Sequence, residues 1–174
     1  VEHYPVLTFA SGPTNSMRGA AYLCDVKDAI VADIGGTTTD IGVLANGFPR
    51  ESSIAVDVGG VRTNFRMPDL TALGLGGGSL VRGEDDISVG PESVGYRLVE
   101  KGLVFGGDTL TATDIAVASG TVDIGDRTRV AGTSKPVVEK ALDEIHKKIE
   151  IGIDRMKTSV DPVPLILVGG GSIL

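Results

Sequence analysis

The stretch VADIGGTTTDIG, residues 31–42, is the most informative part of the sequence. An apolar run ends at Asp33, two glycines and three threonines follow, and a second apolar run begins after Asp40. Short apolar runs bounded by glycine are typical of buried strands, so the pattern predicts strands at 29–34 and 41–44. The sequence therefore predicts a hairpin whose bend offers backbone and hydroxyl groups rather than large side chains.

Further elements are predicted on either side of this hairpin. Asn46-Gly47 is a strong turn signal, and a third strand at 53–58 is expected to return alongside. A helix is predicted over about 135–158, because its apolar residues recur every three or four positions, and a buried strand is predicted within 165–174. The helical stripe consists of Val138, Leu142, Ile145, Ile149, Ile153 and Met156.

The remaining segments are less regular. Residues 1–15 are predicted to be a loop, and 17–23 a short helix. A glycine-rich insert is expected over about 59–130, with a short helix at 114–118 capped by Thr113 or Asp114. This order of strands, irregular insert, long helix and final strand indicates an α/β or α+β fold.

Composition limits the possible functions. The chain has 174 residues, 41% of them hydrophobic, which suits a single folded lobe over residues 1–174. Its formal net charge of -7 argues against a nucleic-acid or anionic-membrane surface, although backbone amides and a cation can still hold a phosphate. The single cysteine, Cys24, is predicted to be a small buried apolar residue and fits a reducing, cytoplasmic compartment. No apolar run approaches the ~18 residues of a membrane span.

Two common phosphate-binding loops are excluded by spacing. A Walker-type loop needs a lysine and a hydroxyl residue after its last glycine, and none of the glycine-rich turns has that lysine. A dinucleotide fingerprint needs a final glycine that Gly74–Ser79 lacks.

The bend itself suits a phosphate. Gly35 and Gly36 have no Cβ, so an anion can approach the backbone, and Thr37, Thr38 and Thr39 add hydroxyl donors. Asp33 would repel a phosphate unless a divalent cation lay between them, a role that suits Mg²⁺. Asp40 could hold a water molecule or fix the turn.

A hairpin bend without a ligand remains an alternative on spacing alone. A second glycine turn, VGGGS at 168–172, favours the ligand, because bare backbone there suits a flat ring or a ribose.

Taken together, these motifs resemble known proteins. D-x-G-G-T-x-T-D at 33–40 resembles a phosphate loop of the actin-like ATPase superfamily, and LVGGGS resembles its adenosine turn. More narrowly, the chain resembles the A-type component of the ATP-dependent hydantoinase/5-oxoprolinase family. The family's motifs occur in order as Ser11-Gly12-Pro13, Asp33–Asp40, Gly74–Leu80, Val89–Ser93, and Gly106-Gly107 with Thr111–Asp114.

The resemblance implies a ribonuclease-H-like lobe that uses ATP and Mg²⁺ to open a cyclic amide or imide through carbonyl phosphorylation. It implies that residues 35–39 hold the β- and γ-phosphates, that Asp33 binds the metal through water, and that Asp40 orients a hydroxyl or water. The adenosine turn would consist of Gly169, Gly170, Gly171 and Ser172. The substrate side would include Gly76, Gly77, Gly78, Ser79 and Asp114.

Departures from the family pattern leave the ring substrate open. Thr14-Asn15-Ser16 replaces the usual A-G-G, and residues 94–98 replace a proline- and glycine-rich run. Family members carry a second phosphate loop in an N-terminal lobe, so this chain is expected to be a half-site that needs that lobe and a B-type subunit or domain. An actin-like nucleotide switch, such as a chaperone or reactivating factor, is the alternative. A glycine-rich binding domain without a nucleotide is a third hypothesis.

Overall fold

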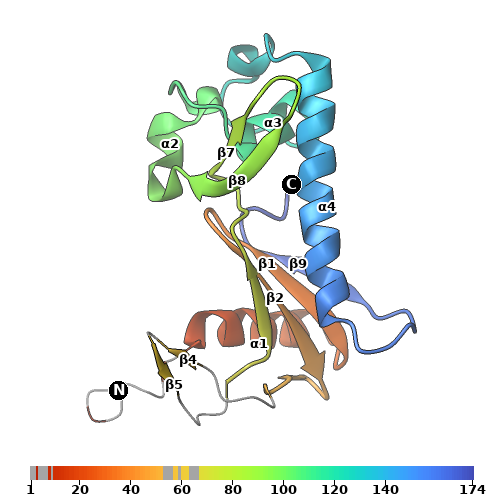
Figure 1. The fold of residues 1–174 in the computed structure, drawn as a ribbon. Coiled ribbons are helices and arrows are strands. Elements are labelled where there is room, and N and C mark those ends of the chain that lie inside the picture. Colours follow the sequence, from red (N-terminus) through yellow and green to blue (C-terminus); the bar gives the residue numbers. More distant parts are fainter. Residues whose placement is uncertain (1–2, 4–7, 9, 53–56, 59, 63–66) are drawn as a thin grey trace.

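A mixed β-sheet forms the lower half of the molecule in Figure 1. The computed structural model describes residues 3, 8, 10–52, 57–58, 60–62 and 67–174. The sheet has the order β3-β2-β1-β9, and β6 also pairs with β2. β1 is antiparallel to β2 and parallel to β9. The strands are β1 (Ala29–Ile34), β2 (Thr39–Ala45), β3 (Phe48–Pro49), β6 (Leu70–Leu73) and β9 (Leu165–Val168).

Helix α1 (Ser11–Cys24) covers one face of the sheet. Its buried residues Met17, Ala20 and Ala21 pack against Val31 and Leu44. The loop predicted for residues 1–15 is therefore wrong from Ser11 onward. Pro13 is tolerated because it lies in the first turn, where amide groups have no intrahelical acceptor. Cys24 is exposed rather than buried, because it lies in the last turn, beyond the buried residues of the helix.

Helix α4 (Lys135–Met156) covers the opposite face and confirms the long helix. The largest hydrophobic cluster contains Ile30, Ala32 and Ile41 of the sheet together with Ile145 and Ile149 of α4. Within the predicted stripe, Val138, Ile145, Ile149 and Met156 are buried, whereas Leu142 and Ile153 are partly buried.

The upper part of the molecule, residues 74–130, packs on the N-terminal half of α4 (Figure 1). Helix α3 begins at Ala112 and is capped by Thr111, not by Thr113 or Asp114 as predicted. Asp114 completes the capping box from the third helical position. The elements here are β7 (Ser79–Arg82), β8 (Ser88–Ser93), η2 (Gly95–Arg97), α2 (Leu98–Lys101), η3 (Leu103–Phe105), α3 (Ala112–Ser119) and η4 (Arg127–Val130).

The predicted strands at 53–58 and 165–174 need correction. Residues 53–56 lie outside the described residues, and within the described part β4 (Asp57–Val58) pairs with β5 (Val61–Arg62). The neighbours of β2 beyond β1 are β3 and β6 instead. β9 is an edge strand, so Leu165 and Leu167 are each 46% exposed. Within the described residues, no helix has both the length and the apolar character that crossing a membrane requires.

Candidate functional site

The bend between β1 and β2 projects from the sheet toward the upper part of the molecule (Figure 1). Ile34 pairs with Thr39, and the Gly35 amide donates to the Thr38 carbonyl at 2.9 Å. Gly36, Thr37 and Thr38 are exposed, and their amides have no acceptor among the described residues. These three amides are free to bind an anion from solvent.

Thr39 differs from the other two threonines of the bend. It has no exposed surface, and its hydroxyl donates to the Leu75 carbonyl at 2.7 Å. Of the three threonines, Thr37 and Thr38 are exposed residues.

Two carboxylates lie at the base of the bend. Asp33 on β1 and Asp40 on β2 are directly opposite each other, and both are half-buried. Burial raises the pKa of the Asp40 carboxyl, and the charge of Asp33 raises it further. Like charges at opposite positions of a strand pair destabilise the sheet unless something neutralises them. A divalent cation that retains several waters would do so, because Mg²⁺ sites often use only one or two carboxylates.

The described residues contain no group of three or more His, Cys, Asp or Glu side chains arranged for a metal. Asp33 and Asp40 supply two carboxylates, which would suit a cation that completes its coordination with water.

The second glycine turn lies directly against the bend. The Gly171 amide donates to the Ile34 carbonyl at 2.7 Å. Gly169 has a φ of +87°, and a Cβ there would lie 2.5 Å from Asp33 Oδ1. Gly170 is exposed, with open space where a Cβ would stand, and Ser172 is half-buried. The two glycine turns predicted to hold one ligand are thus neighbours in space.

The third glycine-rich segment, Gly76–Ser79, lies behind the bend and is buried. The Gly77 amide donates to the Gly35 carbonyl at 3.0 Å, and the Gly78 amide to the Gly36 carbonyl at 2.7 Å. Ser79 is fully buried, and its hydroxyl accepts from the Gly76 amide at 2.9 Å. This segment supports the bend instead of lining an open substrate side, which corrects the expectation from sequence.

The prediction that Asp114 lies on the substrate side is also wrong. It has no exposed surface, and its carboxylate accepts hydrogen bonds from the amides of Val104 and Thr111 and from the Thr111 hydroxyl. The residue stabilises the start of α3 and has no free oxygen to offer a ligand.

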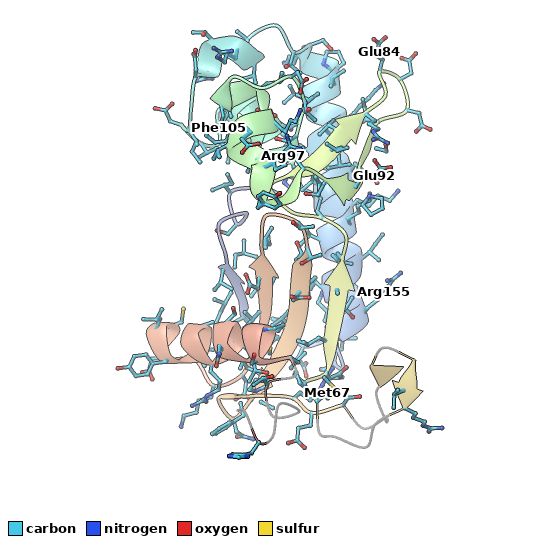
Figure 2. All side chains as sticks on the ribbon, turned by 90° about the vertical axis from the view of Figure 1, so that its left-hand side faces the viewer. Met67, Glu84, Glu92, Arg97, Phe105 and Arg155 are labelled. Carbon is cyan, nitrogen blue, oxygen red and sulfur yellow. The ribbon has the colours of Figure 1, made fainter. Side chains whose placement is uncertain are left out.

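Sequence reasoning missed contacts that the upper part makes with the bend. The Ser93 hydroxyl donates to the Gly36 carbonyl at 3.4 Å, and a Cβ on Gly95 would lie 3.9 Å from Thr37 Oγ1. Figure 2 shows the bend between the upper part, marked by Arg97 and Phe105, and the lower part, where Arg155 marks the end of α4. Ser93 is the last residue of the motif Val89–Ser93, so the sequence could have singled it out. The motif does not indicate which residue Ser93 contacts.

Comparison with solved structures supports the same fold. The chain is similar to the ATP-dependent caprolactamase from Pseudomonas jessenii, with a TM-score of 0.68 and 23% identity over 91% of this chain and 27% of that one. It is also similar to nucleotide-free acetone carboxylase, with a TM-score of 0.57 and 22% identity over 80% of this chain and 23% of that one. The predicted actin-like α/β fold, with a mixed sheet and one long helix, is confirmed. The insert predicted over about 59–130 does not include β6 (Leu70–Leu73), which pairs with β2 in the main sheet.

Sequence comparison gives the family. The chain is 28% identical over 122 residues to the acetophenone carboxylase gamma subunit of Aromatoleum aromaticum. This alignment covers 67% of this chain and 17% of that subunit. The chain thus spans about a sixth of the length of that relative. The family model described as hydantoinase/oxoprolinase matches residues 1–160. The protein chain belongs to the hydantoinase/oxoprolinase family.

Proposed function

We propose that the β1–β2 bend binds the terminal phosphates of ATP. The observation that carries this proposal is the set of three exposed amides, from Gly36 to Thr38, that have no acceptor among the described residues. Successive backbone amides that face one concavity bind anions on acidic proteins without a lysine. The Thr37 and Thr38 hydroxyls supply further donors, and the turn from Gly169 to Ser172 binds the adenosine.

Asp33 would hold, through water, the Mg²⁺ that accompanies ATP. Asp40 would orient a water or hydroxyl group beside it. When bound, Mg²⁺ neutralises charge on the phosphates during transfer. The roles of the chain itself are to position the γ-phosphate with fixed amides and to keep two carboxylates beside it.

The complete protein that carries this chain is proposed to be an ATP-dependent enzyme that acts on a carbonyl compound. For a cyclic amide or imide of the hydantoin or oxoproline type, the carbonyl oxygen attacks the γ-phosphorus and ADP leaves. Water then adds to the phosphorylated carbonyl carbon, and the ring C–N bond breaks, which leaves an acyl phosphate and a free amine. A second water hydrolyses the acyl phosphate to a carboxylate and phosphate. The caprolactamase, which is described as ATP-dependent, supports this reaction class by analogy. A second lobe would supply the other wall of the nucleotide site, and a B-type subunit or domain is the expected partner.

A second candidate is the ATP-dependent carboxylation of a ketone. The 28% identity to an acetophenone carboxylase subunit favours it. In both reactions, ATP would activate a carbonyl compound by phosphorylating its oxygen, so the same phosphate site would serve either one.

Nucleotide binding is tested with the substitution Asp33→Asn in the complete protein. Calorimetry with Mg-ATP is expected to show at least about tenfold weaker binding, because a charge-assisted contact to the cation is lost. Asp143→Asn, at an exposed position of α4, is the matched control and should bind as the wild type does. Unchanged affinity in Asp33→Asn would support a glycine-rich domain without a nucleotide.

The reaction class is tested by phosphate release from ATP in three parallel assays. One contains a cyclic amide such as hydantoin or 5-oxoproline, one a ketone with bicarbonate, and one no acceptor. Stimulation in the first assay supports ring opening, and stimulation in the second supports carboxylation. Equal turnover in all three would support the nucleotide-switch alternative.

A further inference from the structure

We propose that Thr113 is a positioning residue for the phosphate-binding bend and acts on it through the Gly77–Gly78 peptide. The proposal rests on the proposed binding of ATP at the bend. Thr113 lies in the first turn of α3 and is 4% exposed, and its amide and hydroxyl donate to the Gly77 carbonyl rather than to a group of the bend. It can therefore influence a ligand only through the residues between them.

The direction of the bend amides is fixed by the carbonyls of the same peptide units. In a planar trans peptide, the C=O and the following N–H point in opposite directions. The Gly35 and Gly36 carbonyls face the buried segment Gly76–Ser79, where they accept hydrogen bonds from the amides of Gly77 and Gly78. The amides of Gly36 and Thr37 consequently face away from that segment, toward solvent.

The Gly77–Gly78 peptide is itself held by Thr113. The Gly77 carbonyl accepts from both the amide and the hydroxyl of Thr113, each at 2.9 Å. The amide on the other side of this peptide, that of Gly78, donates to the Gly36 carbonyl at 2.7 Å. Two planar peptide units thus connect the Thr113 side chain with the outward amide of Thr37.

The two segments approach closely because Gly76, Gly77 and Gly78 have no Cβ atoms. A Cβ on Gly76 would lie 2.6 Å from the Gly35 oxygen and 2.7 Å from the Thr37 nitrogen. A Cβ on Gly78 would lie 2.9 Å from the Gly36 oxygen. These contacts are with backbone atoms, which cannot move away by rotating a side chain. A methyl group at either position must therefore displace the bend.

The test compares Thr113→Val and Thr113→Ser in the complete protein, with Mg-ATP affinity and the thermal midpoint measured for each. Valine keeps the shape but removes one hydrogen bond to Gly77, and we expect binding about 2–10-fold weaker. Serine restores the hydroxyl and should bind within about twofold of the wild type. Thr71→Val is the matched control: it loses a hydroxyl contact with Met156 Sδ, on α4, and should lower the thermal midpoint without changing ATP affinity.

A second pair of variants reaches the bend without altering Thr113. Gly76→Ala is expected to weaken ATP binding by at least about tenfold, whereas Gly19→Ala, where a Cβ meets nothing within 4 Å, should not. Wild-type affinity in both Thr113→Val and Gly76→Ala, or equal losses in the valine and serine variants, would overturn the positioning role alone. An absence of ATP binding by the wild type would overturn the proposed function and this inference with it.

Discussion

Asp33 and Asp40 affect the stability of the folded chain and lie at the base of the proposed phosphate site. The pKa of Asp40 is raised by burial and by the charge of Asp33, so the folded state binds this proton more tightly than the unfolded chain does. The stabilising contribution of protonated Asp40 is complete below its ordinary pKa of 3.8 and is lost as the pH rises through the folded value. At neutral pH the pair is therefore a local cost that a bound cation would relieve.

The substitution Asp40→Asn should raise the free energy of unfolding at pH 7 by roughly 0.2–1 kcal/mol, because the opposed like charges are removed. The gain should shrink as the pH falls and should vanish near pH ~3, where the wild-type carboxyl is protonated in both states. Urea denaturation at several pH values without divalent cations measures both effects. A variant less stable than the wild type at pH 7 would contradict this account of the pair.

Asp114 gives the opposite expectation, because its carboxylate satisfies buried donors. Asp114→Ala would leave the amides of Val104 and Thr111 and one hydroxyl without an acceptor, at a cost of about 3 kcal/mol or more. Asp143→Ala, at an exposed position, should stay within about 0.5 kcal/mol of the wild type. Denaturant midpoints compare the two, and similar midpoints would show that the buried bonds contribute little.

Among the helices and strands, the predictions from sequence were correct where a segment has one regular apolar pattern and packs against one hydrophobic core. The long helix α4 has an apolar face on a single core, and the β1–β2 hairpin has a glycine bend between two buried runs. Both were predictable because local pattern and tertiary contacts agree there. The neighbouring positions of the two glycine turns follow from the parallel pairing of β1 with β9, which no local pattern reveals.

The failures have physical causes of the same kind. Ser11–Pro13 resemble a loop because proline and glycine disfavour helix interiors, yet a first helical turn accepts both. Gly76–Ser79 resemble a ligand loop, but the backbone of the bend, and not a substrate, occupies the space that the three glycines of this segment leave. Glycines in a sequence indicate that another group approaches the backbone closely, but they do not show whether that group is a ligand or another part of the chain.

Helix α1 offers a test of these packing arguments. Gly19 lies inside the helix, and a Cβ there would meet nothing within 4 Å. Gly19→Ala should therefore raise the free energy of unfolding by roughly 0.5–1 kcal/mol, since alanine loses less backbone entropy on folding. A decrease in the thermal midpoint of this variant would mean that α1 packs more closely at Gly19 than the structure indicates.

For the chain as a whole, the main hydrophobic cluster joins the two parts that Figure 1 shows one above the other. It includes Ile34 and Ile41 from the sheet, Val89 and Ile115 from the upper part, and Ile145 from α4. Ile145→Ala should cost about 2–5 kcal/mol and should keep a single unfolding transition, because both parts share this core. Ile151→Ala, at a position 43% exposed, should cost much less. Two separate transitions, followed by circular dichroism and calorimetry, would show instead that the parts fold independently.

The exposed bend also predicts how the isolated chain behaves with ATP. Gly36, Thr37 and Thr38 are exposed on one side of the proposed phosphate site, and phosphoryl transfer requires charge neutralisation around the whole transferring group. The relatives are much longer, since the chain covers 17–27% of their lengths. We therefore expect the isolated chain to bind Mg-ATP at least about tenfold more weakly than the complete protein and to release no phosphate. Calorimetry and a phosphate-release assay on both proteins measure this difference, and sustained turnover by residues 1–174 alone would show that one bend with its two carboxylates is a sufficient site.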